Sequence, residues 1–197
     1  MQQTKRKFKF GMILTLVFSI SLILSASGFA AVNSGVTVTG SNLSGGTITF
    51  GNYSAITLNG TEQTTTTTWP IGNIVDARGN GSGWNLSLTL SQLSEYDTST
   101  STYVSSGKTL DLGSIKVSTI PVVSMVDSTS SASSTITTVA LNTSLDTGSP
   151  VKLIIAPALK GMGSYSMTAL GTTLTVPASA YAATYKTNAT VALSTGP

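Results

Sequence analysis

The chain has 197 residues, with ten lysines and arginines, seven aspartates and glutamates, and no histidine or cysteine. The missing residue types exclude disulfides, thiol nucleophiles, histidine-based catalytic triads, and metal sites built on histidine or cysteine. Four of the ten basic residues fall within the first thirty positions, so residues 31–197 carry six against seven acids, a net charge of −1. No lysine or arginine cluster is left there to neutralise phosphates, so we expect no nucleic-acid partner.

The first thirty residues have the layout of a secretory signal peptide. Basic residues within positions 5–9 precede an apolar stretch over 10–24, and Gly28-Phe29-Ala30 places small residues where a signal peptidase cleaves. A membrane anchor would need about 20 apolar residues, and this stretch is shorter. We therefore predict cleavage after Ala30, an extracellular protein, and no stable membrane insertion of the remaining chain.

Residues 31–197 are predicted to form one domain, with 31–45 as an N-terminal arm. Alternation of apolar and polar residues dominates, and from Trp84 to Ser91 it predicts a strand with one buried and one wet face. The threonine run over 64–68 is stiff and favours an extended edge or loop. An apolar stretch over 71–76 leads to a glycine-rich turn at 79–83, and a flexible serine-rich insert is predicted at 127–133. In chain order, the predicted strands cover residues 36–39, 47–50, 56–58, 84–91, 109–112, 114–119, 134–141, 151–156, 172–176 and 187–193.

About ten short strands joined by turn residues, with almost no helical periodicity, are typical of an all-β protein. The pattern predicts an antiparallel sandwich or barrel, and we expect a β-sandwich of Ig-like or Greek-key type. No internal repeat and no long linker divides the chain.

Several segments resemble the motifs of the WxL family of bacterial cell-surface proteins. Val75-Asp76-Ala77-Arg78-Gly79 leads to Gly83-Trp84-Asn85-Leu86, which resembles a D-x-R-G turn followed by G-W-x-L. Further matches follow in the family's order: Gly161-Met162-Gly163-Ser164-Tyr165, Leu174-Thr175-Val176-Pro177, Ala180-Tyr181-Ala182-Ala183-Thr184-Tyr185 and Ser194-Thr195-Gly196-Pro197. The chain departs from the family at Val191-Ala192-Leu193, where a second tryptophan is often found. If that tryptophan contacts the wall, binding here would be weaker or differently selective.

The resemblance implies a secreted, non-enzymatic β-sandwich that attaches non-covalently to peptidoglycan or an associated cell-wall polymer of a Gram-positive-type bacterium. It implies no cofactor, and other surface proteins could be partners. The chain ends without an L-P-x-T-G-like signal, which agrees with non-covalent attachment. Two alternatives stay open. One is a pilin-like or matrix-fibre subunit, whose strand-like arm over 32–39 would complement a neighbour's sheet edge. The other is an adhesin.

Six residues are candidates for wall binding: Trp84, Leu86, Asp76, Arg78, Tyr181 and Tyr185. Trp84 could stack on sugars, but it shares a strand face with Leu86, which favours a role in the core. Asp76 and Arg78 could hydrogen-bond a saccharide, but a local ion pair that fixes the turn is the simpler interpretation. The tyrosines could form an aromatic strip, although such residues usually bury their rings and leave the hydroxyl at the rim.

Catalytic patterns in the sequence are weak. Ser105-Ser106-Gly107-Lys108 matches S-x-x-K but lacks the companion elements of that motif. Glu95 and Asp97 lie in a tyrosine-containing loop, where two solvated carboxylates are a simpler interpretation than a glycosidase pair. The aspartates are scattered and lack the spacing of a calcium loop. We therefore expect no enzymatic activity and no metal site.

Overall fold

The computed structural model describes residues 36–197, so the predicted signal peptide over 1–30 and the start of the arm lie outside the described residues. Residues 39–197 form one compact unit, whereas Val36–Val38 have no regular secondary structure. The described chain contains fourteen strands and one 3₁₀ helix, η1: β1 (Leu43–Gly45), β2 (Gln63–Trp69), β3 (Ile74–Asp76), β4 (Trp84–Leu90), β5 (Ser94–Asp97), β6 (Thr102–Tyr103), β7 (Ile115–Thr119), β8 (Val123–Met125), η1 (Ser133–Thr135), β9 (Thr137–Thr138), β10 (Val151–Ala156), β11 (Gly163–Met167), β12 (Leu170–Val176), β13 (Tyr185–Lys186) and β14 (Ala189–Thr195).

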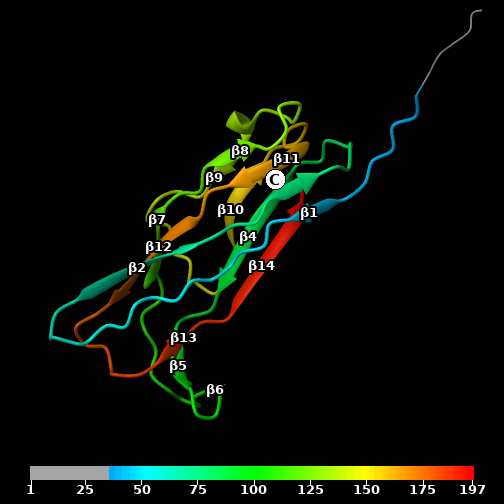
Figure 1. Ribbon diagram of the computed structural model, residues 1–197. Helices are drawn as coiled ribbons and strands as arrows, with labels where there is room; N and C mark the ends of the chain where they lie inside the picture. The colour runs from blue at the N-terminus through cyan, green and yellow to red at the C-terminus, as the bar shows by residue number, and fades with distance from the viewer. Residues whose placement is uncertain (1–35) are drawn as a thin grey trace, which may run out of the picture. The chain divides into compact units, whose positions relative to one another are not determined.

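The strands form four sheets, and every strand pair in the described residues is antiparallel. Two sheets have four strands, in the orders β1-β3-β11-β8 and β14-β4-β10-β9 (Figure 1). The other two have three strands, in the orders β2-β12-β7 and β13-β5-β6. The predicted all-β, antiparallel sandwich is confirmed.

β4 is an inner strand, paired with β10 on one side and β14 on the other. Its four apolar side chains are fully buried, as the alternation predicted: Trp84, Leu86, Leu88 and Leu90. The opposite face is drier than predicted, since Asn85 is buried and its side-chain amide donates to the carbonyl of Gly196 at 2.8 Å. The end of the chain therefore covers part of the face that was expected to be wet.

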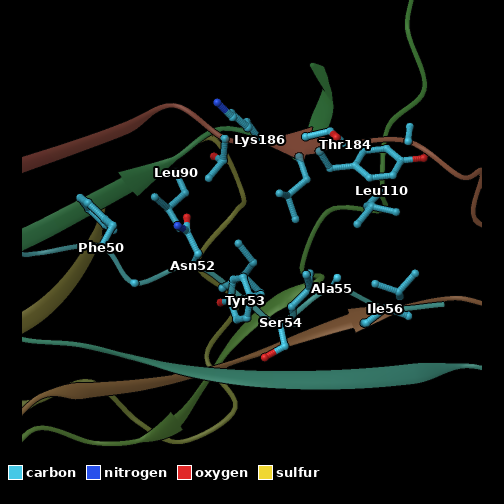
Figure 2. Close-up of a pocket in the computed structure, with 18 of the residues that line it drawn as sticks. Phe50, Asn52, Tyr53, Ser54, Ala55, Ile56, Leu90, Leu110, Thr184 and Lys186 are labelled. Atoms are coloured by element: carbon cyan, nitrogen blue, oxygen red, sulfur yellow. The ribbon is translucent and has the colours of Figure 1, made fainter. Parts of the chain in front are cut away.

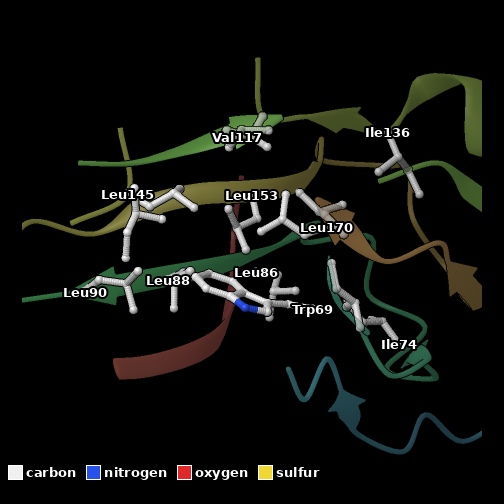
Figure 3. Packing of buried hydrophobic residues seen from close by; sticks show 14 of the residues in the cluster. Trp69, Ile74, Leu86, Leu88, Leu90, Val117, Ile136, Leu145, Leu153 and Leu170 are labelled. Carbon is white, nitrogen blue, oxygen red and sulfur yellow. The ribbon is translucent and has the colours of Figure 1, made fainter. Parts of the chain in front are cut away.

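The hydrophobic core packs against the apolar face of β4. In Figure 3 the leucines of this strand lie opposite Leu145 and Leu153, with Leu170 beside them. All three of these partners are fully buried. Full burial of one such side chain contributes about 1.5–3 kcal/mol, so this cluster supplies much of the stability of the domain.

Three of the predicted strands are wrong. Residues 36–39, 47–50 and 56–58 form no strand, and a single bridge between Ile48 and Ile71 is the only ladder element there. These segments have strand-like composition, but strand formation requires a neighbour whose backbone groups are free to pair. Residues 56–58 have no backbone partner among the described residues, and residues 47–49 pair only briefly, through the Thr49 amide to the Pro70 carbonyl and the Gly72 amide to the Thr47 carbonyl.

Other boundaries also differ from the predictions. The threonine run becomes β2, paired along its whole length with β12. The strand predicted over 134–141 is reduced to η1 and the two-residue β9, and 109–112 forms only one bridge, from Thr109 to Ser94. Among residues 36–197, no helix is long and apolar enough to cross a membrane.

Candidate functional site

Asp76 and Arg78 form a buried ion pair at the end of β3. Arg78 Nε donates to Asp76 Oδ1 at 2.9 Å and Nη2 donates to Oδ2 at 2.9 Å, which is a bidentate arrangement. Nη2 also donates to the carbonyl of Gly83 at 2.7 Å, and Nη1 donates to Oγ1 of Thr195 at 2.7 Å. The predicted local ion pair is confirmed, and the same guanidinium also connects the start of β4 to the end of β14.

The surroundings of this pair strengthen it. Asp76 is 3% exposed and the side chain of Arg78 is 11% exposed, so water screens the two charges weakly. Hydrogen bonds from the Arg78 side chain hold the pKa of Asp76 below its ordinary value of 3.8, against the opposing effect of burial. Asp76 is therefore ionised at neutral pH, and its two oxygens are already occupied by Arg78.

Trp84 and Leu86 lie in the core and expose no surface. Trp84 Nε1 donates to the carbonyl of Gly161 at 2.9 Å, and its ring centroid lies 6.0 Å from that of the buried Tyr165. Gly161 has a φ of +74°, and a Cβ at this position would lie 2.8 Å from Trp84 Nε1. Only glycine fits against the indole at this position. The favoured structural role of Trp84 agrees with this packing.

The remaining candidates, Tyr181 and Tyr185, lie in and beside the small sheet β13-β5-β6. Tyr185 donates its hydroxyl proton to the carbonyl of Tyr181 at 2.9 Å, and its ring is half-buried. Burial raises the pKa of Tyr185, with the nearby charge of Glu95 adding to the effect. Tyr181 is 62% exposed, and the ammonium group of Lys108 lies 4.3 Å from its ring centroid. Tyr185 thus follows the expected pattern of a packed ring, whereas the ring of Tyr181 is open to solvent.

The same small sheet carries further aromatic and basic side chains. The rings of Tyr96 and Tyr103 meet edge to face, with centroids 5.3 Å apart, and Lys186 Nζ lies 3.8 Å from the Tyr96 centroid. Strand register places Lys186 on the face of Tyr96, and Tyr185 on the opposite face. We call this region the tyrosine–lysine sheet; it consists of β5, β6 and β13 with Tyr96, Tyr103, Lys108, Tyr181, Tyr185 and Lys186.

The structure does not bring the six candidates together. Asp76 and Arg78 lie at the Trp84 end of β4, because Arg78 contacts Gly83 and Thr195. The tyrosine–lysine sheet follows the opposite end, since Leu90 precedes β5 and pairs with Ala189. The six steps from Trp84 to Leu90, at roughly 3.3 Å each, separate the two ends by about 20 Å. No single small ligand could contact both groups of candidates.

A groove of about 1100 Å³ lies next to the tyrosine–lysine sheet, between residues 50–58 and 181–187. Figure 2 shows Tyr53 and Ile56 on one side and Thr184 and Lys186 on the other, with Leu90 between them. The floor consists of buried apolar side chains, and the rim carries amide, hydroxyl and ammonium groups. Such a combination can bind a ligand that has both apolar and hydrogen-bonding parts.

Two interior polar groups were missed by the sequence reasoning. Asp146 is fully buried and accepts hydrogen bonds from the backbone amides of Ser114 and Ile115, each at 3.1 Å. Burial raises the pKa of this carboxyl, although the amide hydrogen bonds oppose the effect. Tyr53 donates to Oγ1 of Thr172 at 2.8 Å, and burial raises its pKa to about 12. Both groups are occupied in holding loops, and residues far apart in sequence surround them, so no local pattern could have revealed them.

The acidic side chains of residues 36–197 form no catalytic or metal-binding cluster. Within residues 36–197, no three acidic, histidine or cysteine side chains come close enough to hold a metal ion. Glu95 accepts a hydrogen bond from the backbone amide of Lys108 at 2.8 Å, and Asp97 accepts bonds from the amide and hydroxyl of Ser99. Glu95 and Asp97 therefore lie in β5 and not in a loop as predicted, and their carboxylates hold neighbouring turns through hydrogen bonds.

Residues 39–197 match the protein family described as WxL domain surface cell wall-binding. No protein of curated function and no solved structure matches the chain significantly. The family match covers the whole compact unit, from the Asp76–Arg78 pair to the tyrosine–lysine sheet. This family is one of wall-binding domains and not of enzymes. The chain therefore belongs to the WxL family and is a cell-surface domain that binds the bacterial cell wall.

Proposed function

We propose that the protein is exported, loses its first thirty residues, and attaches non-covalently to the cell wall through the tyrosine–lysine sheet. The membership in a wall-binding family supports attachment to peptidoglycan or an associated polymer. The exposed ring of Tyr181 supports the location, since it is the most exposed aromatic side chain among residues 36–197. Aromatic faces that are open to water stack on sugar rings.

The other candidates would act indirectly. Trp84 and Leu86 are buried, and Asp76 and Arg78 bind each other, so we propose that these four hold the fold that positions the wall-binding surface. The Val191-Ala192-Leu193 segment, which replaces a second tryptophan, lies in β14 beside β4. Within this segment, Val191 and Leu193 pack against the core. We therefore propose that this departure from the family changes packing more than it changes the proposed contact surface.

Co-sedimentation with purified cell walls tests the proposal, using a chain that begins at Ala31. We expect Tyr181→Ala to weaken binding by up to about tenfold, because one aromatic contact is worth about 0.5–1.5 kcal/mol. Leu159→Ala is the matched control: Leu159 is large and 74% exposed, but its backbone amide donates to the carbonyl of Gly81 at the other end of β4. Equal binding of the parent and Tyr181→Ala would contradict the tyrosine–lysine sheet as the wall-binding surface. If the parent binds intact walls but not walls stripped of secondary polymers, those polymers are the ligand.

The mode of attachment is tested in the same preparation. Denaturant should release the protein at the full mass of residues 31–197, without attached wall fragments. A wall fragment that stays linked after denaturation would show a covalent anchor and contradict the proposal.

A further inference from the structure

The groove beside the tyrosine–lysine sheet has one wall whose backbone is unpaired. No backbone–backbone hydrogen bond joins residues 52–58 to any other part of the described chain, and only the carbonyl of Thr57 receives a side-chain donor, Nε2 of Gln63 at 2.8 Å. Residues 181–183 on the opposite wall likewise lack backbone partners among the described residues. An extended peptide that entered the groove could therefore form a ladder with backbone groups that are now open to water.

The floor and rim of the groove favour apolar side chains from such a peptide. Leu90, Leu93 and Leu110 line the floor and are almost fully buried. On the rim, Phe50 and Leu58 remain 41% and 37% exposed, although both are large and apolar. An incoming strand that placed every second side chain toward this floor would cover apolar surface that the chain itself leaves open.

The arm at the start of the described chain has the matching pattern. Val36-Thr37-Val38-Thr39 alternates apolar and hydroxyl residues, all four are β-branched, and none is charged. Val36 and Val38 are each 87% exposed, more than any other large hydrophobic residue described. This segment has the composition of a strand, and it forms no strand within its own chain.

The arm is too short to reach the groove of its own chain. It joins the compact unit at Ser41, whose amide donates to the carbonyl of Ala77 at 2.7 Å, beside the Asp76–Arg78 pair. That point lies at the Trp84 end of β4, whereas the groove lies beyond Leu90, about 20 Å away. Val36 lies five steps along the chain from Ser41, and five fully extended residues span at most about 18 Å. The length of the chain therefore favours the groove of another copy as the acceptor for these valines.

We propose that copies of this protein join head to tail, with Val36–Thr39 of one copy lying as a strand in the groove of the next. Val36 and Val38 face the apolar floor, Thr37 and Thr39 face the solvent, and residues 52–58 supply the pairing backbone. The contact joins two different surfaces, the arm of one copy and the groove of the next, so it is heterologous and can extend into chains of copies. Each contact is small, so assembly depends on protein concentration. The proposal goes beyond wall attachment, although the groove borders the tyrosine–lysine sheet and shares Tyr181, Tyr185 and Lys186 with it.

Sedimentation velocity over a range of concentrations tests this assembly, using the chain that begins at Ala31. The parent should form dimers and longer species, and Val36→Asp/Val38→Asp should weaken association about a hundredfold, since burial of each valine contributes at least about tenfold. Thr37→Asp/Thr39→Asp adds the same charge to the other face of the same arm and should assemble more strongly than the valine variant. A parent that stays monomeric at all concentrations, or equal loss in both variants, would overturn the proposal.

Disulfide trapping identifies the acceptor, because the natural chain has no cysteine. Mixed single variants Val38→Cys and Ile56→Cys should form a covalent heterodimer on mild oxidation, whereas Val38→Cys with Leu159→Cys should not. Preferential linkage to position 159 would overturn the assignment of the groove. The valine variant should still sediment with cell walls like the parent, so failure of assembly and failure of wall attachment are read separately.

Discussion

Replacement of Arg78 by methionine is expected to be among the most destabilising single changes in this domain. Methionine keeps most of the apolar stem but removes both bonds to Asp76 and those to Gly83 and Thr195. Asp76, only 3% exposed, would then keep one donor, the backbone amide of residue 78 at 3.2 Å. Removing one partner of a buried ion pair typically costs about 3–5 kcal/mol, because the other charge is left without compensation.

A loss of this size is large against the whole stability of a domain, which is about 5–15 kcal/mol. For a domain of this length it corresponds to a fall in the melting temperature of about 6–20 °C. Urea unfolding is the suitable assay, since urea is uncharged and leaves the ion pair unscreened. The slope of the unfolding free energy against urea should stay the same, and the midpoint should fall.

The double variant Asp76→Asn/Arg78→Met provides the control. It removes the buried charge together with its partner, so it should be more stable than the sum of the two single changes predicts, by about 1–3 kcal/mol. Arg78→Lys keeps the charge but not the planar fork, and should fall between parent and methionine variant. A cost below about 1 kcal/mol for Arg78→Met, or strict additivity in the cycle, would refute the conclusion that this pair joins β3, β4 and β14.

Three further predictions concern the core, acid stability and wall binding. Trp84→Ala should lower the unfolding free energy measured in urea by about 3–5 kcal/mol. Trp84→Phe should lower it by about 1–3 kcal/mol, because the carbonyl of Gly161 loses its donor. A Trp84→Ala variant that unfolds like the parent but no longer binds walls would show that Trp84 contacts the wall. Because the folded pKa of Asp76 is lowered below 3.8, its stabilisation is fully present above that pH and is lost as pH falls through the folded value. The difference in unfolding free energy between parent and Asp76→Asn should therefore shrink below about pH 4, and an equal difference at pH 3 and pH 7 would contradict this. Residues 31–197 carry a net charge of only −1, so long-range electrostatic attraction should contribute little to wall binding. Sedimentation with walls should therefore persist at about 0.5 M salt, where the Debye length is a few ångströms. Release by modest salt alone would indicate an electrostatic mechanism.

Local pattern was sufficient wherever a segment is buried on one face by the sheet it belongs to. The alternation from Trp84 to Ser91 predicted β4 to within one residue, together with its buried face, because a period of two leaves only one register that hides all four apolar residues. The Asp76–Arg78 pair was also predictable, since the two residues lie two positions apart and flank a turn. The reach of Arg78 to Thr195 was not, because 117 positions separate them in the chain.

Strand formation depended on neighbouring strands that cannot be identified from the local sequence. Residues 56–58 have strand composition but no backbone neighbour, and remain irregular. β11 begins with Gly163 and Ser164, which do not favour strands, yet it forms a ladder because β3 and β8 lie on its two sides. A strand is stabilised by pairing across the sheet, so composition alone cannot decide which segments pair.

The sequence by itself determined the fold class, the family and the absence of histidine and cysteine chemistry. It also named Tyr181 and Tyr185, but it could not separate them from Trp84, because all are aromatic residues in family-like motifs. Tertiary structure alone decided that Trp84 is enclosed while Tyr181 is open to water, and that Lys108 lies over the ring of Tyr181. Exposure and proximity arise from the packing of segments that are distant in the chain, and a linear pattern carries neither of them.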